Sequence, residues 1–289
     1  MSGYLSIRNL TVRLKGGAMI LRDVSLTVRA GQVHGLVGES GAGKSMIGKA
    51  VLGTLPRALE VVSGQIILDG TDLQTLDPKE RRRRIGASAA LIPQDPLTAL
   101  NPSKRIGPQI TRRLVDILGW PKIAAEARAL ELLEEVHIPD PARVMRSYPH
   151  ELSGGMRQRI LIASAFAAEP KLIIADEPTT ALDVTVQKQI LRLISEMQSR
   201  HDTALLFVTH DLGVVSKVCD TLSVLYAGKV VEEANMHRFF MRPIHPYSAA
   251  LLAATPTYTD PTGSLTPVPQ TVIDGVEREV AEHDMRAAP

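Results

Sequence analysis

The chain has 289 residues, of which 44% are hydrophobic, and its formal net charge is only +2. This length can form one large domain or two modest ones with a sizeable core. A nearly neutral chain offers no global basic field for nucleic acid. The single cysteine, Cys219, excludes a disulfide framework and a cysteine-based metal cluster within the chain. No secretory signal opens the chain and no apolar run approaches the ~18 residues of a membrane span, so we expect a cytosolic protein or one that a partner holds at a membrane.

The first forty residues are expected to form strands. Residues 4–14 alternate polar and apolar side chains with a change of register near Asn9, and residues 20–29 follow after a glycine-containing turn. Two successive strands joined by a short turn predict an antiparallel pair. Residues 32–37 are largely apolar, which predicts a buried strand that leads directly into a glycine-rich loop.

Residues 38–45 fit the pattern G-x-x-x-x-G-K-[ST], the phosphate loop of nucleotide-binding proteins. Its glycines let the backbone curl tightly and bring N–H groups close to phosphate oxygens without an intervening Cβ. The helix expected to follow adds the positive end of its dipole. Lys44 would reach the β- and γ-phosphates, and Ser45 would bind Mg²⁺. The expected nucleotide-binding residues here are Gly38, Glu39, Ser40, Gly41, Ala42, Gly43, Lys44, Ser45 and Met46.

Further short elements follow the first helix. Residues 63–70 predict a strand bounded by glycines, and Asp77 followed by proline predicts the N-cap of a short helix. The four arginines at 81–84 are interpreted as a solvated face. A nucleic-acid or membrane-surface patch is the alternative, and the lack of interleaved aromatic residues disfavours it. Residues 88–94 predict another strand.

The pattern becomes helical between residues 95 and 165, where prolines punctuate the chain. Residues 123–137 are amphipathic, and we expect Ala127, Leu130 and Leu133 on the inward face of one helix. This stretch predicts an α-helical subdomain inserted into the α/β chain.

The alternation of strands and helices resumes at residue 171. Residues 171–176 and 203–209 are apolar strands of the kind that is buried on both faces, and strands are also expected within residues 221–234. Alternating strands and helices predict a parallel sheet covered on both sides. Residues 256–269 are rich in Pro and Thr and predict a linker or surface wrap. Residues 270–289 are polar, and we expect them to be weakly ordered with at most one short helix.

Polar residues at strand ends supply the groups that phosphoryl transfer requires: a metal, an oriented water and stabilised equatorial oxygens. Asp176 ends a strand at the edge where open α/β sheets bind ligands, and it is the expected Mg²⁺ partner alongside Ser45. Glu177 would polarise the attacking water as a general base. Gln94 would reach the metal and the water, and His210 would hydrogen-bond the γ-phosphate. Any one of these residues alone would be an ordinary polar residue at the end of a strand. Because they occur together with a phosphate loop and at the same edge of the sheet, they favour a hydrolytic centre.

A second anion site is expected at another helix N-terminus. Ser153 is an N-cap type of residue, and Gly154 and Gly155 leave backbone N–H groups accessible before a clearly helical run. Because this site lies in the helical insert, we do not expect it to reach the first site in the same molecule. The pattern therefore suggests that ATP is sandwiched between two subunits.

From about residue 4 to residue 254 the chain resembles the ATP-binding subunit of an ABC transporter. The matching motifs, in the family's order, are Walker A (38–45), the Q-loop (Gln94), the signature (152–156), Walker B (172–177), the D-loop (181–183) and the H-loop (His210). The resemblance implies a P-loop NTPase with a RecA-like parallel sheet core, an N-terminal antiparallel β subdomain and the inserted helical subdomain. It also implies that Asp183 takes part in nucleotide binding, and that an ABC domain (1–254) precedes a C-terminal extension (255–289).

Three segments resemble the peptide/nickel import branch of that family: residues 93–102, 152–159 and 245–252. Three features depart from the wider family. Met156 replaces the usual signature Gln, as in this branch's own variant, and Leu14 stands where an adenine-stacking aromatic is expected. The C-terminal cysteine cluster of longer peptide-importer ATPases has no counterpart, so no iron–sulfur site is expected.

The resemblance implies the ATP-hydrolysing motor of an importer, with ATP and Mg²⁺ as cofactors. Expected partners are a second ABC ATPase subunit, two transmembrane permease subunits and an extracytoplasmic solute-binding protein, with no nucleic acid. The subunit would lie peripherally at the cytoplasmic face of the bacterial inner membrane. The cargo, a peptide, nickel chelate or related solute, cannot be read from a subunit that never touches it. One rival is a soluble ABC ATPase acting on nucleic acid or ribosomes, and another is a degenerate scaffold, which the presence of Lys44, Glu177 and His210 disfavours.

Overall fold

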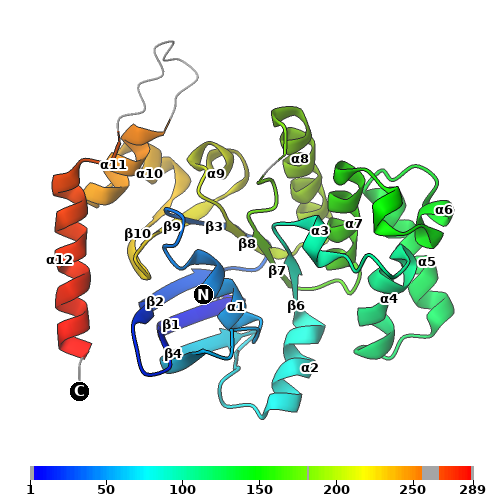
Figure 1. Cartoon of the computed structure of the whole chain (residues 1–289), viewed down its shortest axis with the longest axis horizontal. Coiled ribbons are helices and arrows are strands. Elements are labelled where there is room, and N and C mark those ends of the chain that lie inside the picture. Colours follow the sequence, from blue (N-terminus) through cyan, green and yellow to red (C-terminus); the bar gives the residue numbers. More distant parts are fainter. Residues whose placement is uncertain (1–2, 181, 256–266, 288–289) are drawn as a thin grey trace. The chain divides into compact units, whose positions relative to one another are not determined.

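The computed structural model describes residues 3–180, 182–255 and 267–287 (Figure 1). The chain divides into two compact units. The first unit comprises Met1–Thr75 and Leu206–Pro289, and the second comprises Leu76–Leu205. Ala181 of the expected D-loop and most of the expected linker, residues 256–266, lie outside the described residues. None of the described helices has both the length and the apolar character needed to cross a membrane.

The first unit holds both ends of the chain. Its elements, in chain order, are β1 (Leu5–Leu14), β2 (Met19–Val28), β3 (Val33–Val37), α1 (Lys44–Val51), β4 (Leu59–Leu68), β5 (Thr71–Asp72), β8 (Ala204–Val208, which begins at the end of the second unit), α9 (Leu212–Val218), β9 (Thr221–Tyr226), β10 (Lys229–Asn235), α10 (Met236–Met241), α11 (Pro246–Ala254) and α12 (Gln270–Ala287).

An antiparallel sheet with the order β2-β1-β4-β5 opens the first unit, as expected for its N-terminal part. The predicted register change is confirmed, because Asn9 has a φ of 50° and the pairing of β1 shifts around it. Strand β4 starts at Leu59, so the expected boundary at Gly64 is wrong. Gly64 lies inside the strand, where a Cβ would stand 2.3 Å from the Asn9 carbonyl oxygen, and it is the single residue of β4 opposite the bulge that Asn9 and Leu10 form in β1.

The strands that lead to the phosphate loop are buried in the same unit. Strands β10, β9, β3 and β8 are neighbours in that order, with β10 antiparallel and β3 parallel to β9. Every residue of β3 and β8 is buried. Continuous apolar strands of this kind are typical of parallel core sheets that are covered on both faces.

The second unit comes, in sequence, between the two segments of the first and is mainly helical. Its elements are α2 (Pro78–Ser88), β6 (Ala89–Ile92), α3 (Pro96–Ala99), α4 (Ile106–Asp116), α5 (Lys122–Glu135), α6 (Pro141–Arg146), the 3₁₀ helix η1 (Pro149–Glu151), α7 (Gly154–Phe166), β7 (Leu172–Asp176) and α8 (Val184–Arg200). Asp77 caps α2 as predicted, because its carboxylate accepts the N–H groups of Lys79 at 2.8 Å and Glu80 at 3.0 Å.

The expected inward face of α5 is partly wrong. Leu133 is buried, but Ala127 is exposed and Leu130 is only half-buried. The buried residues of the helix are Ala125, Ala129, Leu132 and Leu133. Alanines stand on several sides of this helix and carry little information about its orientation, so the large leucines near its end decide which face packs against α4 and α7.

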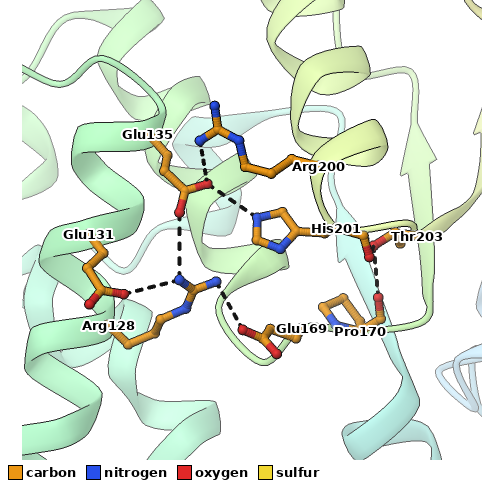
Figure 2. Close-up of polar contacts among 8 residues, drawn as sticks. All are labelled: Arg128, Glu131, Glu135, Glu169, Pro170, Arg200, His201 and Thr203. Carbon is orange, nitrogen blue, oxygen red and sulfur yellow. Dashed lines mark hydrogen bonds and ion pairs between the residues drawn. The ribbon is translucent and has the colours of Figure 1, made fainter.

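A cluster of charged side chains joins α5 to the end of α8 and to the loop before β7 (Figure 2). We call it the α5–α8 cluster; it consists of Arg128, Glu131, Glu135, Glu169, Arg200 and His201. Glu135 lies within 3.6 Å of Arg128, 3.1 Å of Arg200 and 3.3 Å of His201. Its side chain is only 18% exposed, and the guanidinium groups of Arg128 and Arg200 are close enough to offset much of its desolvation.

The C-terminal residues also differ from the expectation. Instead of a weakly ordered tail, residues 270–287 form the 18-residue helix α12. Val276 and Val280 on this helix are 2% and 9% exposed, and Val276 joins the core around Val37 and Tyr247. The valines at 272, 276 and 280 repeat at one-turn spacing among polar residues, a sparse stripe that the overall polarity of the segment conceals.

Candidate functional site

The phosphate loop follows β3 and curls through backbone conformations that favour glycine. Gly38, Gly41 and Gly43 have φ values of 154°, 83° and 101°. A Cβ on Gly38 would lie 2.2 Å from the carbonyl oxygen of Leu225, so only glycine fits there without displacement of the backbone. These constraints confirm the predicted strand, loop and helix arrangement of residues 33–51.

Lys44 begins helix α1 and is 5% exposed. Its Nζ atom donates hydrogen bonds to the carbonyl oxygens of Gly38 at 2.7 Å and Glu39 at 2.8 Å. The ammonium group is therefore held against the loop's own backbone. Ser45 and Met46 lie in the first turn of α1, whose N–H groups and dipole make a helix start favourable for anions.

His210 lies in the same unit, immediately after β8, and is exposed. The N–H of the preceding residue, Thr209, donates to the carbonyl oxygen of Leu36 at 3.1 Å, which ties this turn to the strand that enters the phosphate loop. Asp211 then caps α9 by accepting the N–H of Gly213 at 2.8 Å. The turn that carries His210 is thus anchored on both sides.

In the second unit, Gln94 and Glu177 come together. Strands β6 and β7 are parallel with Ile92 opposite Ala175, and each of the two polar residues comes two positions after its member of that pair. The Nε2 atom of Gln94 donates to Oε2 of Glu177 at 3.4 Å. Asp176, half-buried at the end of β7, is the neighbour of Glu177 in sequence.

The backbone of Glu177 has a φ of 46°, in the left-handed region that non-glycine residues seldom adopt. Its carboxylate is held by a second donor, because the Thr180 hydroxyl reaches Oε2 at 2.9 Å. Strained backbone of this kind persists where the surroundings fix it and is concentrated at functional sites. The orientation of Glu177 is therefore determined by the loop and not by solvent.

The signature residues start helix α7. Ser153 is its N-cap, and its hydroxyl accepts the N–H of Met156 at 3.3 Å. Ser153 and Gly154 are exposed, and a Cβ on Gly154 would meet no atom within 4 Å. The first turn therefore presents accessible N–H groups, as expected for an anion site.

Asp183 has a clear structural role at the start of α8. Its carboxylate accepts the N–H groups of Thr185 at 3.0 Å and Val186 at 2.9 Å. An N-cap carboxylate of this kind stabilises a helix by roughly 1 kcal/mol. The expected contribution of Asp183 to nucleotide binding stays a prediction.

Gln158 is a polar residue that sequence reasoning missed. It lies on α7, is 1% exposed, and donates from Nε2 to the carbonyl oxygen of Pro178 at 2.8 Å. The bond ties the helix that starts at the signature to the residue directly after Glu177. A glutamine within a largely apolar helical run could have indicated a buried hydrogen bond. Its partner, however, is a backbone carbonyl twenty residues away, which no local sequence pattern identifies.

The structure thus places the predicted residues in two groups. The phosphate loop and His210 belong to the first unit, while Gln94, Asp176, Glu177, Ser153 to Gly155 and Asp183 belong to the second. Among the described residues there is no cluster of three or more His, Cys, Asp or Glu side chains suited to hold a metal by themselves. Leu14, at the position expected for the adenine-stacking aromatic, ends β1 and is 42% exposed.

Comparison with protein families gives two matches. The ABC transporter family matches residues 21–180. A shorter match, over residues 145–216, is to a family described as an AAA domain, putative AbiEii toxin, Type IV TA system. The first match covers the phosphate loop, Gln94, the signature and the carboxylates that end β7.

Curated relatives point to the same family. The chain is 45% identical to the dipeptide transport ATP-binding protein DppD of Escherichia coli (strain K12), over 86% of this chain and 76% of that protein. It is 45% identical to the oligopeptide transport ATP-binding protein OppD of Bacillus subtilis (strain 168), over 88% and 72%. With DppD of Bacillus subtilis the identity is 43%, over 95% and 83%.

Solved structures share the fold. CbiO1 from Clostridium perfringens, part of the ABC transporter complex cbiONQ, aligns with a TM-score of 0.73 and 25% identity over 84% of this chain and 92% of that one. A dimeric post-hydrolysis state of the ATP-binding cassette MJ0796, bound to ADP and Pi, aligns with a TM-score of 0.69 and 26% identity over 80% and 98%. The predicted fold class, a P-loop NTPase with an N-terminal antiparallel sheet and a helical subdomain, is confirmed. The chain belongs to the ABC transporter family, as an ABC ATPase of the branch that includes the dipeptide and oligopeptide transport ATP-binding proteins.

Proposed function

We propose that the chain is the ATP-hydrolysing motor of an importer for short peptides. The observation that carries the proposal is the pair formed by Gln94 and Glu177, since it places an oriented carboxylate at the strand edge of a chain that also has a complete phosphate loop. The similarity to DppD and OppD supports dipeptides or oligopeptides as the cargo. A nickel chelate or a related solute is the alternative within this branch.

In the proposed mechanism, the phosphate loop binds ATP, and Glu177, Gln94 and His210 serve its hydrolysis. Lys44 exchanges its bonds to the loop carbonyls for the β- and γ-phosphates. Glu177, held by Gln94 and Thr180, orients water and accepts its proton, a role that contributes about 10²–10⁴-fold. His210 donates a hydrogen bond to the γ-phosphate.

Mg²⁺ fits the residues that we assign to it. A hydroxyl from Ser45, an amide oxygen from Gln94 and a carboxylate from Asp176 are the hard oxygen donors that this ion prefers. The Nε2 atom of Gln94 donates to Glu177, so its Oε1 atom is the one left to face a cation. When bound, the ion would neutralise charge on the β- and γ-phosphates.

We further propose that two subunits bind ATP between them, each closing the other's site with Ser153, Gly154 and Gly155, and Asp183 beside it. The exposure of the first turn of α7 supports an external ligand. Two permease subunits and a solute-binding protein outside the membrane complete the proposed complex, with the ATPase at the cytoplasmic face.

The test is transport by the complete complex. The chain, co-expressed with peptide permease subunits and a solute-binding protein, should restore uptake of labelled dipeptide or tetrapeptide to cells that lack peptide importers. Lys44→Ala should abolish that uptake. Restored nickel uptake with no peptide uptake would reject the peptide assignment. Tight binding of the chain to nucleic acid or ribosomes, without association with membrane proteins, would reject the importer role.

A further inference from the structure

The C-terminal helix α12 is bound to strand β2 by a two-bond ion pair. Asp284 accepts Nε of Arg22 at 2.7 Å on one carboxylate oxygen and Nη2 at 2.8 Å on the other. The Arg22 side chain is only 12% exposed. Paired hydrogen bonds between a guanidinium and a carboxylate are stronger and more specific in geometry than single ones. The pair therefore fixes the position of both side chains.

Arg22 also holds the turn that joins β9 to β10. Its Nη1 atom donates to the carbonyl oxygen of Ala227 at 2.7 Å. Its backbone N–H donates to the carbonyl oxygen of Gly228 at 2.8 Å. The two turn residues have φ values of 42° and 78°, as in tight two-residue hairpin turns. One arginine thus binds both peptide carbonyls of the turn and the carboxylate of α12.

This turn packs against the phosphate loop. The N–H of Gly228 donates to the carbonyl oxygen of Ala42 at 2.8 Å. At the start of the loop, Gly38 approaches the carbonyl oxygen of Leu225 so closely that a Cβ would lie 2.2 Å from it. A Cβ on Gly43 would lie 3.6 Å from the Cα of Gly228. The hairpin therefore supports the loop near both of its ends.

Two further residues of α12 reach the same hairpin. Glu279 binds Nζ of Lys229 at 3.0 Å. Burial, together with the carboxylates of Glu277 on α12 and Glu39 in the phosphate loop, raises the pKa of Tyr226. Residues of α12 thus interact with Lys229 on one side of the turn and with Tyr226 on the other. Tyr226 is also close enough to the phosphate loop for Glu39 to affect its pKa.

We propose that Arg22 and Asp284 are positioning residues for ATP binding, which act by fixing the Ala227–Gly228 turn that supports the phosphate loop. The inference rests on the binding of ATP by that loop. Without the ion pair, the turn and the loop sample other conformations, and the apparent affinity falls with the fraction of molecules whose loop is competent to bind. The hydrolytic residues of the second unit are unchanged, so turnover at saturating ATP is preserved.

The experiment compares variants of the full chain, with the dissociation constant of ATP measured by titration with a fluorescent ATP analogue and by competition with ATP. Arg22→Ala should weaken ATP binding about tenfold, the loss expected for one charge-assisted contact. Asp284→Ala should weaken it about threefold, because Arg22 keeps its bonds to the turn. Arg22→Lys, which keeps the charge but lacks the planar group that binds three oxygens, should fall between wild type and Arg22→Ala.

Two measurements distinguish a positioning role from a general structural one: the effect of the double variant on ATP affinity, and whether KM changes without kcat. Asp284→Ala should have no further effect in the Arg22→Ala background, and the KM for ATP should rise in all variants while kcat changes by less than twofold. Arg278→Ala is the matched control, since that exposed arginine of α12 bonds only within its own helix, at the Asp274 carbonyl. It should leave ATP affinity unchanged.

An ATP affinity within twofold of wild type in folded Arg22→Ala and Asp284→Ala would overturn the proposal, as would fully additive losses in the double variant. Should Arg22→Ala unfold near the assay temperature, Asp284→Ala alone decides, because it alters only the far partner of the pair. A wild-type chain that binds ATP no better than Lys44→Ala would reject ATP binding itself, and the proposal with it.

Discussion

The hydroxyl of Thr180 donates to Oε2 of Glu177 at 2.9 Å, the same oxygen that Gln94 approaches at 3.4 Å. Two donors from different loops therefore converge on one carboxylate oxygen. Hydrogen bonds from two separate donors restrict the rotation of the Glu177 side chain. This arrangement suits a carboxylate that must hold a water in one direction.

Replacement of Glu177 by Gln should separate ATP binding from hydrolysis. The amide is isosteric and keeps the hydrogen bond from Thr180, so the loop should stay in place while the base is lost. Phosphate release should fall by at least about 10²-fold, with the dissociation constant of ATP nearly unchanged. Undiminished phosphate release would remove Glu177 from the role of general base.

Thr180→Val should test the orientation of that carboxylate. Valine has the shape of threonine without the hydroxyl, so kcat should fall by about 10- to 100-fold, the cost of one hydrogen bond to a charged group. Thr75→Val removes an exposed hydroxyl that bonds only the Asp72 carbonyl and should leave turnover unchanged. Equal kcat values for the two variants would mean that Thr180 does not orient Glu177.

Two glycine-to-alanine substitutions should change the free energy of unfolding in opposite directions. Gly38→Ala places a Cβ against the Leu225 carbonyl, at a φ of 154°, and should lower the free energy of unfolding by at least about 2 kcal/mol. Gly154→Ala adds a Cβ in open space within a helix and should raise it by up to about 1 kcal/mol. Urea unfolding of both variants measures these values.

The Gly154→Ala variant also tests the proposed dimer. In Gly154→Ala the new methyl group stands where the partner's nucleotide would approach, so hydrolysis should fall although the folded subunit is at least as stable. A Gly154→Ala protein with normal ATP hydrolysis and transport would argue that the first turn of α7 receives no partner nucleotide.

The stability of the chain should fall in mild acid because of His34. Burial lowers the pKa of this histidine from 6.5 to about 4, and its ring nitrogens bind the hydroxyls of Thr221 and Ser223. Below pH 6.5 the unfolded chain takes up a proton that the folded chain excludes, so stability is lost as the pH falls towards 4. The total is roughly 3 kcal/mol. Urea unfolding at pH 7.5 and 5.5 should show a loss that His34→Gln largely removes, and an identical loss in that variant would refute the assignment.

Glu135 should contribute more to stability than an exposed ion pair does. Glu135→Gln removes the carboxylate shared by Arg128, Arg200 and His201 in the α5–α8 cluster (Figure 2) and should cost about 1–2 kcal/mol, since the site is partly buried. Glu196→Gln breaks the exposed pair with Arg192 and should cost less than about 0.5 kcal/mol. Equal costs would show that the cluster is screened like any surface pair.

The sequence was most informative where one residue type alone satisfies a local constraint. Three such predictions were confirmed: the glycines of the phosphate loop, the register change at Asn9 and the cap at Asp77. Each depends on backbone geometry within a few residues. Gln94 and Glu177 could be brought together because both follow parallel strands, whose ends share an edge.

Contacts between distant segments could not be predicted in this way. The partner of Gln158 is a backbone carbonyl, which has no residue type to identify it. Helix α12 is bound by Arg22, which precedes its partner Asp284 by 262 residues. The orientation of α5 depends on which face its neighbours leave open, and alanines on several sides do not specify that face.

The bond between Gln158 and Pro178 has a consequence for a pair of subunits. Helix α7 begins at the signature, and one turn later its Gln158 braces the loop that carries Glu177. In the proposed dimer the start of this helix would bind the partner's nucleotide, while the same rigid helix would steady the subunit's own catalytic carboxylate. Departure of phosphate from one site would then alter the base at the other. Because coupling between binding sites is reciprocal, ATP bound at one site and ATP bound at the other would change each other's affinity by the same factor, and Gln158→Leu would weaken that coupling.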